Sequence, residues 1–352
     1  MDYVKSSVHN SFSKLMRTRN FYLLLAIVLA MFIGPLIIGN SPFPMHVLIM
    51  TCFYAFLGTA WNVVGGYVGM VSLGHAAYFG LGAYIEALAF LEYGVNPWFG
   101  MMIGAAGAAV FGVAIGIPSI RFRGGGAFFC MVSIAFAETV RLVFLNYKIG
   151  GGAMGVLLPA LPSSLASFQF SSKLPYYYII LIFLLVELFV IYEISKAKIG
   201  YYFVAIREDE VKAEALGINI SKYKLVAIAI SAFLTAIAGV FYVQYVLYFD
   251  PYSVFPVNLS VYMALVATIG GRGTVLGPTL GSLILTPISE YTRVLLGGSF
   301  RGISLAAYGI VMMVVVIVMP AGIIALVMRF YHPTVRKSKQ DQAQGETEDD
   351  DS

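Results

Sequence analysis

The side chains that could do chemistry are few, because only 11% of the 352 residues are Asp, Glu, Lys or Arg. Glu138 and Arg141 stand three apart inside an apolar run, where they could form a structural ion pair or line a solute pathway. Ser72 and His75 are polar groups in a glycine-rich stretch, and a lone histidine there is more often a satisfied packing residue than a ligand. No HExxH spacing or clustered nucleophile and acid–base set occurs, which disfavours a membrane-embedded enzyme.

The densest group of charges lies in a long basic loop at about residues 195–223. Its segment 205–217 is predicted as a moderately amphipathic helix that stops at Gly217. Such a helix could lie at the bilayer surface, or it could dock into a groove of a cytoplasmic partner. The candidate docking residues are Arg207, Glu208, Asp209, Glu210, Glu214, Ala215 and Gly217.

Two stretches, 65–74 and 270–281, contain too many glycines for plain membrane spans. Small residues there permit close helix packing or a broken helix. The two sequences are weakly similar to each other, as two copies of an internal repeat would be, but the similarity is too short to establish a repeat. The candidate pathway or helix-break residues are Gly66, Gly69, Ser72, Gly74, His75, Glu138, Arg141, Gly270 and Gly271.

The elements that must position these residues are membrane spans. The chain is 59% hydrophobic with a mean hydropathy of +0.84, and a soluble surface of roughly 25% charged residues cannot be built from it. Some of the predicted segments are short or glycine-dense and could be broken or re-entrant. Ten apolar segments are predicted at about 21–39, 45–64, 70–92, 97–118, 126–146, 174–194, 224–248, 257–270, 275–296 and 302–328.

Lys and Arg gather in alternate loops, and with ten crossings every basic cluster falls on one side, so both termini are expected in the cytoplasm. Residues 1–20 are then a cytoplasmic N-terminal segment and 21–328 a transmembrane domain, with the loop at about 195–223 on the cytoplasmic side. The acidic segment 329–352 is expected to be a disordered cytoplasmic tail. Because the basic residues cluster in several short loops rather than on one face or in one arm, the sequence argues against nucleic-acid binding. Cys52 and Cys130 lie in apolar runs and are expected to be small core residues.

The order of these stretches resembles the branched-chain amino-acid ABC permeases of the LivM type. Residues 66–84 resemble the signature GYxGxxSLGHAAFFGxGAY, with Tyr78 in place of Phe and Met70 at a commonly polar position. Because further matches follow in the same order, the resemblance covers about residues 60–322. These matches lie at 133–141, 150–159, 205–217, 270–281 and 320–322.

This resemblance implies an all-α integral membrane protein of about ten transmembrane helices, some broken or re-entrant, in the type II-like ABC importer permease fold. Segment 205–217 would match the coupling helix that inserts into a cleft of an ATPase subunit. The implied partners, besides the lipid bilayer, are a second related permease subunit, two ATPase subunits and an extracytoplasmic solute-binding protein. The chain has no GxxxxGK[ST] loop, so no cofactor is expected in it, and ATP and Mg would bind to the partner ATPases.

We therefore expect a transporter subunit of the cell (inner) membrane, not an enzyme, that imports leucine, isoleucine and valine. One alternative is the same importer class acting on urea, short amides or another small solute. The other is an ion-coupled secondary transporter, which would need charged groups or half-helix ends at the bilayer midplane. That alternative leaves the charged loop 195–223 without a role. The sequence leaves the identity of the solute open. It also leaves open whether the permease pair is a homodimer or a heterodimer.

Overall fold

The computed structural model describes residues 41–121, 125–147 and 150–296, with a few isolated positions beyond them. The N-terminal segment 1–20, the acidic tail 329–352 and the 320–322 match lie outside these ranges, as do the spans 21–39 and 302–328 apart from the isolated positions. The main helices are α2 (Pro42–Asn62), α3 (His75–Tyr93), α4 (Pro97–Arg121), α5 (Gly125–Asn146), α6 (Leu174–Lys196), α7 (Lys198–Glu208), α8 (Glu210–Ala215), α9 (Ile220–Val246), α10 (Pro251–Val254), α11 (Val257–Gly271) and α12 (Gly277–Leu296).

The remaining elements are short. A π-helical turn, η1 (Val63–Tyr67), continues α2, and a 3-10 turn, η3 (Gly152–Met154), follows α5. Strands β1 (Val156–Leu157) and β2 (Tyr248–Phe249) pair antiparallel. The predicted all-α membrane fold is confirmed, because eight of the ten predicted apolar segments fall on α2 to α6, α9, α11 and α12.

Within the described ranges, six helical segments are long and apolar enough to cross a membrane, so the chain is a multi-pass membrane protein. They are Pro42–Tyr67, Pro97–Arg121, Phe128–Asn146, Leu174–Lys196, Ile220–Val246 and Pro251–Gly271.

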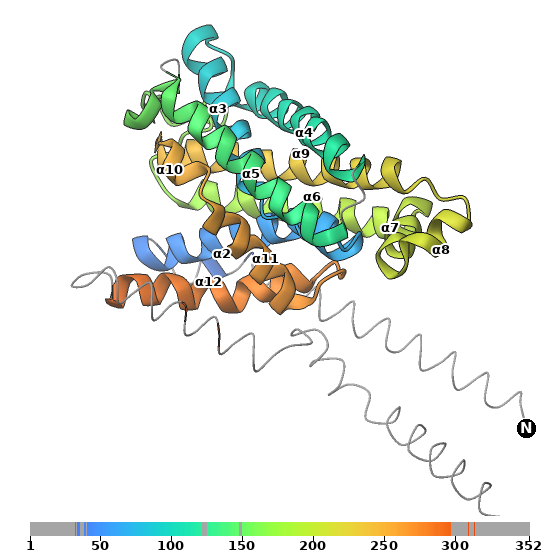
Figure 1. The fold of residues 1–352 in the computed structure, drawn as a ribbon. Coiled ribbons are helices and arrows are strands. Elements are labelled where there is room, and N and C mark those ends of the chain that lie inside the picture. The colour runs from blue at the N-terminus through green and yellow to red at the C-terminus, as the bar shows by residue number, and fades with distance from the viewer. Residues whose placement is uncertain are drawn as a thin grey trace, which may run out of the picture.

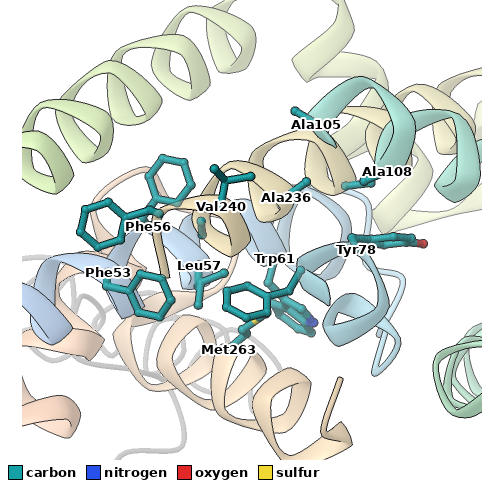
Figure 2. Close-up of a cluster of buried hydrophobic side chains, with 14 of the residues drawn as sticks. Phe53, Phe56, Leu57, Trp61, Tyr78, Ala105, Ala108, Ala236, Val240 and Met263 are labelled. Carbon is teal, nitrogen blue, oxygen red and sulfur yellow. The ribbon is translucent and has the colours of Figure 1, made fainter. Parts of the chain in front are cut away.

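Helix α2 packs against α6, α9, α11 and α12, and Figure 1 shows it beside α11 and α12. Its side chains Phe53, Leu57 and Trp61 are almost fully buried. Figure 2 shows them beside Val240 of α9 and Met263 of α11. A helix buried on nearly all sides is apolar all round, which is why the run 45–64 has no polar face.

Helices α3, α4 and α9 approach one another through residues with little or no side chain. A Cβ on Gly82 would lie 2.5 Å from the carbonyl oxygen of Ala236, and one on Gly104 would lie 2.8 Å from that of Gly82. Gly80 of α3 faces the ring of Phe255. Because these positions are filled by neighbouring backbone and side chains, helix packing accounts for Gly80 and Gly82.

Candidate functional site

The charged loop after α6 forms two helices, so the single helix predicted over 205–217 is wrong. Asp209 separates α7 from α8 with an extended backbone, at φ −162° and ψ 108°. Its carboxylate accepts hydrogen bonds from the N–H groups of Val211 (3.0 Å) and Lys212 (3.1 Å). Asp favours such a cap over a helix interior because its short side chain competes for backbone N–H groups. The backbone N–H and then the side chain of Lys212 hold the pKa of Asp209 below its usual value.

Helix α8 ends where the sequence predicts. Gly217 adopts φ +82°, a conformation that a residue with a side chain rarely takes. Its N–H donates to the carbonyl of Glu214 (2.9 Å), and the N–H of Ile218 donates to that of Ala213 (3.1 Å). This is the Schellman arrangement that satisfies the last carbonyls of a helix. The predicted stop at Gly217 is confirmed.

The outer side of α8 is exposed and carries both apolar and charged side chains. Val211 is 77% exposed and Leu216 is 80% exposed, and Glu214 and Ala215 are also exposed. The inner side is held by Ala213, which is buried. Figure 1 shows α7 and α8 together at one end of the bundle, here called the α7–α8 end. Of the residues predicted for docking, Glu214, Ala215 and Gly217 are therefore exposed at this end, whereas Arg207 and Glu210 also contact the bundle.

Two charged contacts fix the helix pair to the bundle. Glu210 forms an ion pair with Lys224 of α9, with 2.7 Å between Oε1 and Nζ. Arg207 donates from Nη1 to the carbonyl oxygen of Gly66 in η1 (3.1 Å) and pairs with the neighbouring Glu208. Lys224 is almost buried and Gly66 is buried. The contacts of Glu210 and Arg207 therefore join the loop to elements inside the bundle.

Arg207 also touches both glycine-rich stretches. A Cβ on Gly69, which has φ +81°, would lie 2.8 Å from Cγ of Arg207. A Cβ on Gly273, at φ +73°, would collide with the Arg207 guanidinium. Each stretch therefore forms a turn with a glycine, and so no side chain, at the point where Arg207 passes between them. These are called the two turns below.

Asn62, at the end of α2, ties the two stretches together. Its Nδ2 donates to the carbonyl of Thr274 (2.9 Å), and its Oδ1 accepts from the N–H of Gly273 (2.9 Å). A Cβ on Gly66 would lie 2.5 Å from the nitrogen of Gly273. Asn62 was not predicted from the sequence, although a buried amide three positions before Gly65 inside an apolar run needs such partners.

The predicted breaks at both stretches are confirmed. Helix α3 begins only at His75, so residues 68–74 connect it to η1 without a helix. Helix α11 ends at Gly271 with φ +129°, and Gly270 packs so closely that a Cβ there would lie 3.0 Å from the nitrogen of Gly281. Gly66, Gly69, Gly270 and Gly271 thus belong to two turns joined through Asn62 and Arg207.

Ser72 and His75 hold the 68–74 connection in place. His75 Nδ1 lies 2.9 Å from Ser72 Oγ, and its Nε2 lies 2.7 Å from Ser231 Oγ. Ser231 uses its own proton on the carbonyl of Ala60 (2.6 Å), so Nε2 of His75 must donate and Nδ1 must accept. With both ring nitrogens occupied, His75 fits the packing interpretation. Gly74 lies against the backbone of Ser133, where a Cβ would be 2.9 Å from its carbonyl carbon.

Glu138 and Arg141 form an ion pair on α5, away from the two turns. The Arg141 guanidinium also lies 5.2 Å from the ring centre of Tyr252 in α10. The side chain of Glu138 is 40% exposed and that of Arg141 is 19% exposed. This geometry agrees with the structural-pair interpretation. Within the described ranges, no group of three or more His, Cys, Asp or Glu side chains could hold a metal ion.

These features define a multi-pass integral membrane protein whose exposed, charged helix pair is anchored on two glycine-rich helix breaks. The family model for the permease component of branched-chain amino acid transport systems matches residues 43–320. The chain belongs to this family, and the LivM-type resemblance is confirmed.

Curated relatives agree with that assignment. The LivM permease protein of the high-affinity branched-chain amino acid transport system of Escherichia coli K12 is 29% identical over 280 residues, which cover 71% of this chain and 65% of that protein. LivM of Salmonella typhimurium is 28% identical, with coverages of 84% and 72%. LivH of the same Salmonella strain is 25% identical, with coverages of 77% and 91%. The chain thus spans about two thirds of the LivM proteins' length. No solved structure matches it.

Proposed function

We propose that this chain is a membrane-spanning permease subunit of an ATP-driven importer of leucine, isoleucine and valine. The observation that carries this proposal is the family match across residues 43–320, which includes α7, α8 and both glycine-rich turns. The names of the LivM and LivH relatives support the substrate class. In this role the chain is a transporter subunit and not an enzyme.

The α7–α8 pair is the proposed docking site for an ATPase subunit. A short helix with exposed Val211 and Leu216 beside acidic and basic groups suits a groove in a protein partner. ATP and Mg would bind to that partner. A second permease, related to this chain as LivH is to LivM, and an extracytoplasmic binding protein would complete the importer.

Arg207 offers the mechanical link for this coupling. Movement of α8 would shift α7, because the two helices are separated by Asp209 alone. Arg207 would transmit that shift to η1 through Gly66 and to the α11–α12 turn through its contact at Gly273. Asn62 would keep the two turns moving together.

The α7–α8 end is proposed to face the cytoplasm, with both termini on that side of an inner membrane. Arg121 at the end of α4 and Lys196 at the end of α6 support this orientation, as do Lys212 in α8 and Lys222 in the first turn of α9. No observation favours the secondary-transporter alternative. Urea or a short amide is the alternative solute for the same importer class.

The test is uptake of labelled leucine by cells lacking this gene, before and after complementation, with excess valine, urea or ribose as competitor. We expect complementation to restore uptake and valine to block it. In parallel, the tagged chain should capture an ATPase subunit from detergent extracts of the complemented cells. Restored uptake without any captured ATPase would contradict the ATP-driven class, and unchanged leucine uptake would contradict the substrate.

A further inference from the structure

A cavity of about 510 Å³ lies among α2, α10, α11 and α12. It is far from the α7–α8 end. Ser289, in its lining, is twelve residues beyond the start of α12 at Gly277, which is about 18 Å along a helix. Asn258 is thirteen residues before the end of α11 at Gly271, or about 20 Å. The cavity therefore lies toward the opposite membrane face from Arg207.

One side of the cavity is apolar. Leu259, Val261 and Leu265 of α11 line it together with the rings of Tyr54 and Tyr262. The two rings meet edge to face, with centres 4.5 Å apart, so they form one continuous wall. Sites for small molecules commonly combine such walls with a few polar groups in volumes of roughly 300–1,000 Å³.

The polar groups of the lining include one cation, Arg293, among the described residues. Its Nη1 lies 3.4 Å from Oε1 of Glu290, whose side chain is only 4% exposed, whereas that of Arg293 is 67% exposed. A guanidinium carries five N–H donors in a planar fork, so this one long contact leaves donors for a ligand carboxylate. Asn258, Ser289 and Thr292 add oxygen atoms that can accept hydrogen bonds from an ammonium group.

We propose that this cavity receives an aliphatic α-amino acid on its way through the permease. The carboxylate would bind Arg293, the ammonium group would meet the oxygens of Asn258, Ser289 or Thr292, and the aliphatic chain would lie on the α11 wall. This inference rests on the proposed importer function and deepens it. A cation facing an apolar wall suits a zwitterion with a hydrocarbon side chain better than urea or a sugar, which carry no carboxylate and little apolar surface.

The test uses the complete importer in proteoliposomes, with labelled L-leucine uptake and ATP hydrolysis measured side by side. Arg293→Gln should lower leucine uptake at least tenfold, and Arg293→Lys, which keeps the positive charge, should retain a larger share. Ser289→Trp fills the cavity and should abolish uptake. Leu283→Trp is the matched control, because Leu283 is on the same helix, is 50% exposed and lies outside the lining. This control should import leucine normally.

A second measurement does not depend on turnover. Thr292→Cys should react with a membrane-impermeant methanethiosulfonate reagent added outside intact cells, and excess L-leucine should slow that reaction while urea should not. Wild-type protein, with Cys52 and Cys130 alone, gives the background.

The outcomes separate this inference from the proposed function. If wild-type importer moves leucine but Arg293→Gln and Ser289→Trp do so at the wild-type rate, the cavity is not the solute site and the importer assignment stands. If Ser289→Trp fails to fold, the Arg293→Gln and Arg293→Lys pair decides the question. If wild-type importer does not move leucine, the proposed function and this inference both fall.

Discussion

Replacing Arg207 with Ala should uncouple ATP hydrolysis from transport. The substitution removes the hydrogen bond from Nη1 to the Gly66 carbonyl and the packing of the side chain between Gly69 and Gly273. It leaves the exposed face of α8, with Val211 and Leu216, unchanged. The docking surface should therefore persist while its connection to the two turns is lost.

The size of the expected loss of coupling follows from the strength of the hydrogen bond between Arg207 and Gly66. A hydrogen bond from a charged donor is worth about 1.5–3 kcal/mol. The Arg207 side chain is 34% exposed, which places this bond toward the lower end of that range. Since about 1.4 kcal/mol corresponds to a factor of ten, we expect leucine imported per ATP hydrolysed to fall about tenfold. For Arg207→Lys, the leucine imported per ATP hydrolysed should lie between the values for wild type and Arg207→Ala, because an ammonium keeps the charge but lacks the planar fork of the guanidinium.

The assay is the ratio of labelled leucine uptake to phosphate release in proteoliposomes that contain the complete importer. Arg121→Ala is the matched control. Arg121 is also an exposed arginine in the last turn of a helix, α4, but it lies outside the charged loop. That variant should keep a near-normal ratio. An unchanged ratio in Arg207→Ala would refute the transmission role, and loss of the co-purifying ATPase would show that Arg207 acts in docking instead.

Three further results are expected. Asp209→Ala should speed hydrogen exchange at the amide of Val211. Because the pKa of Asp209 is lowered in the folded protein, the wild-type protection should be full above the unfolded pKa of about 3.9 and be lost as the pH falls through the lower folded value. Gly66→Ala should destabilise the protein by about 1–3 kcal/mol, seen as a lower Tm in detergent, because its new methyl group meets the side-chain amide of Asn62 and the backbone nitrogen of Gly273. Gln244→Leu should lower the Tm by removing the 2.7 Å hydrogen bond to the buried Glu86 carboxylate, at a cost of about 1–3 kcal/mol, and adding Glu86→Gln to it should recover part of the loss.

The membrane helices could be predicted from the sequence because each span carries its own signal in about twenty apolar residues. The stop at Gly217 was equally local, since a glycine after a helical pattern marks the left-handed cap. The break at Asp209 was not predicted because the moderate amphipathic pattern runs on through it. A capping aspartate differs from a surface aspartate only in which backbone N–H groups it meets.

The assembly of the site could not be predicted, because its contacts join distant parts of the chain. Asn62 and Gly273 are 211 positions apart, and Arg207 and Gly66 are 141 apart. Glycine content marked both turns as unusual, but it did not show that they touch. For His75, the sequence left packing and pathway roles open, and the structure favours packing because Ser72 and Ser231 occupy both ring nitrogens.

The backbone contacts among α3, α4 and α9 have a consequence for how this family changes over time. Gly104 sits on the carbonyl of Gly82, and Gly82 sits on that of Ala236, so three helices share one crowded point. A larger residue at any one position would force the helices apart unless a neighbour became smaller or a helix shifted. Across relatives, these three positions should therefore vary together, and a natural substitution at one of them should be accompanied by a compensating change at another.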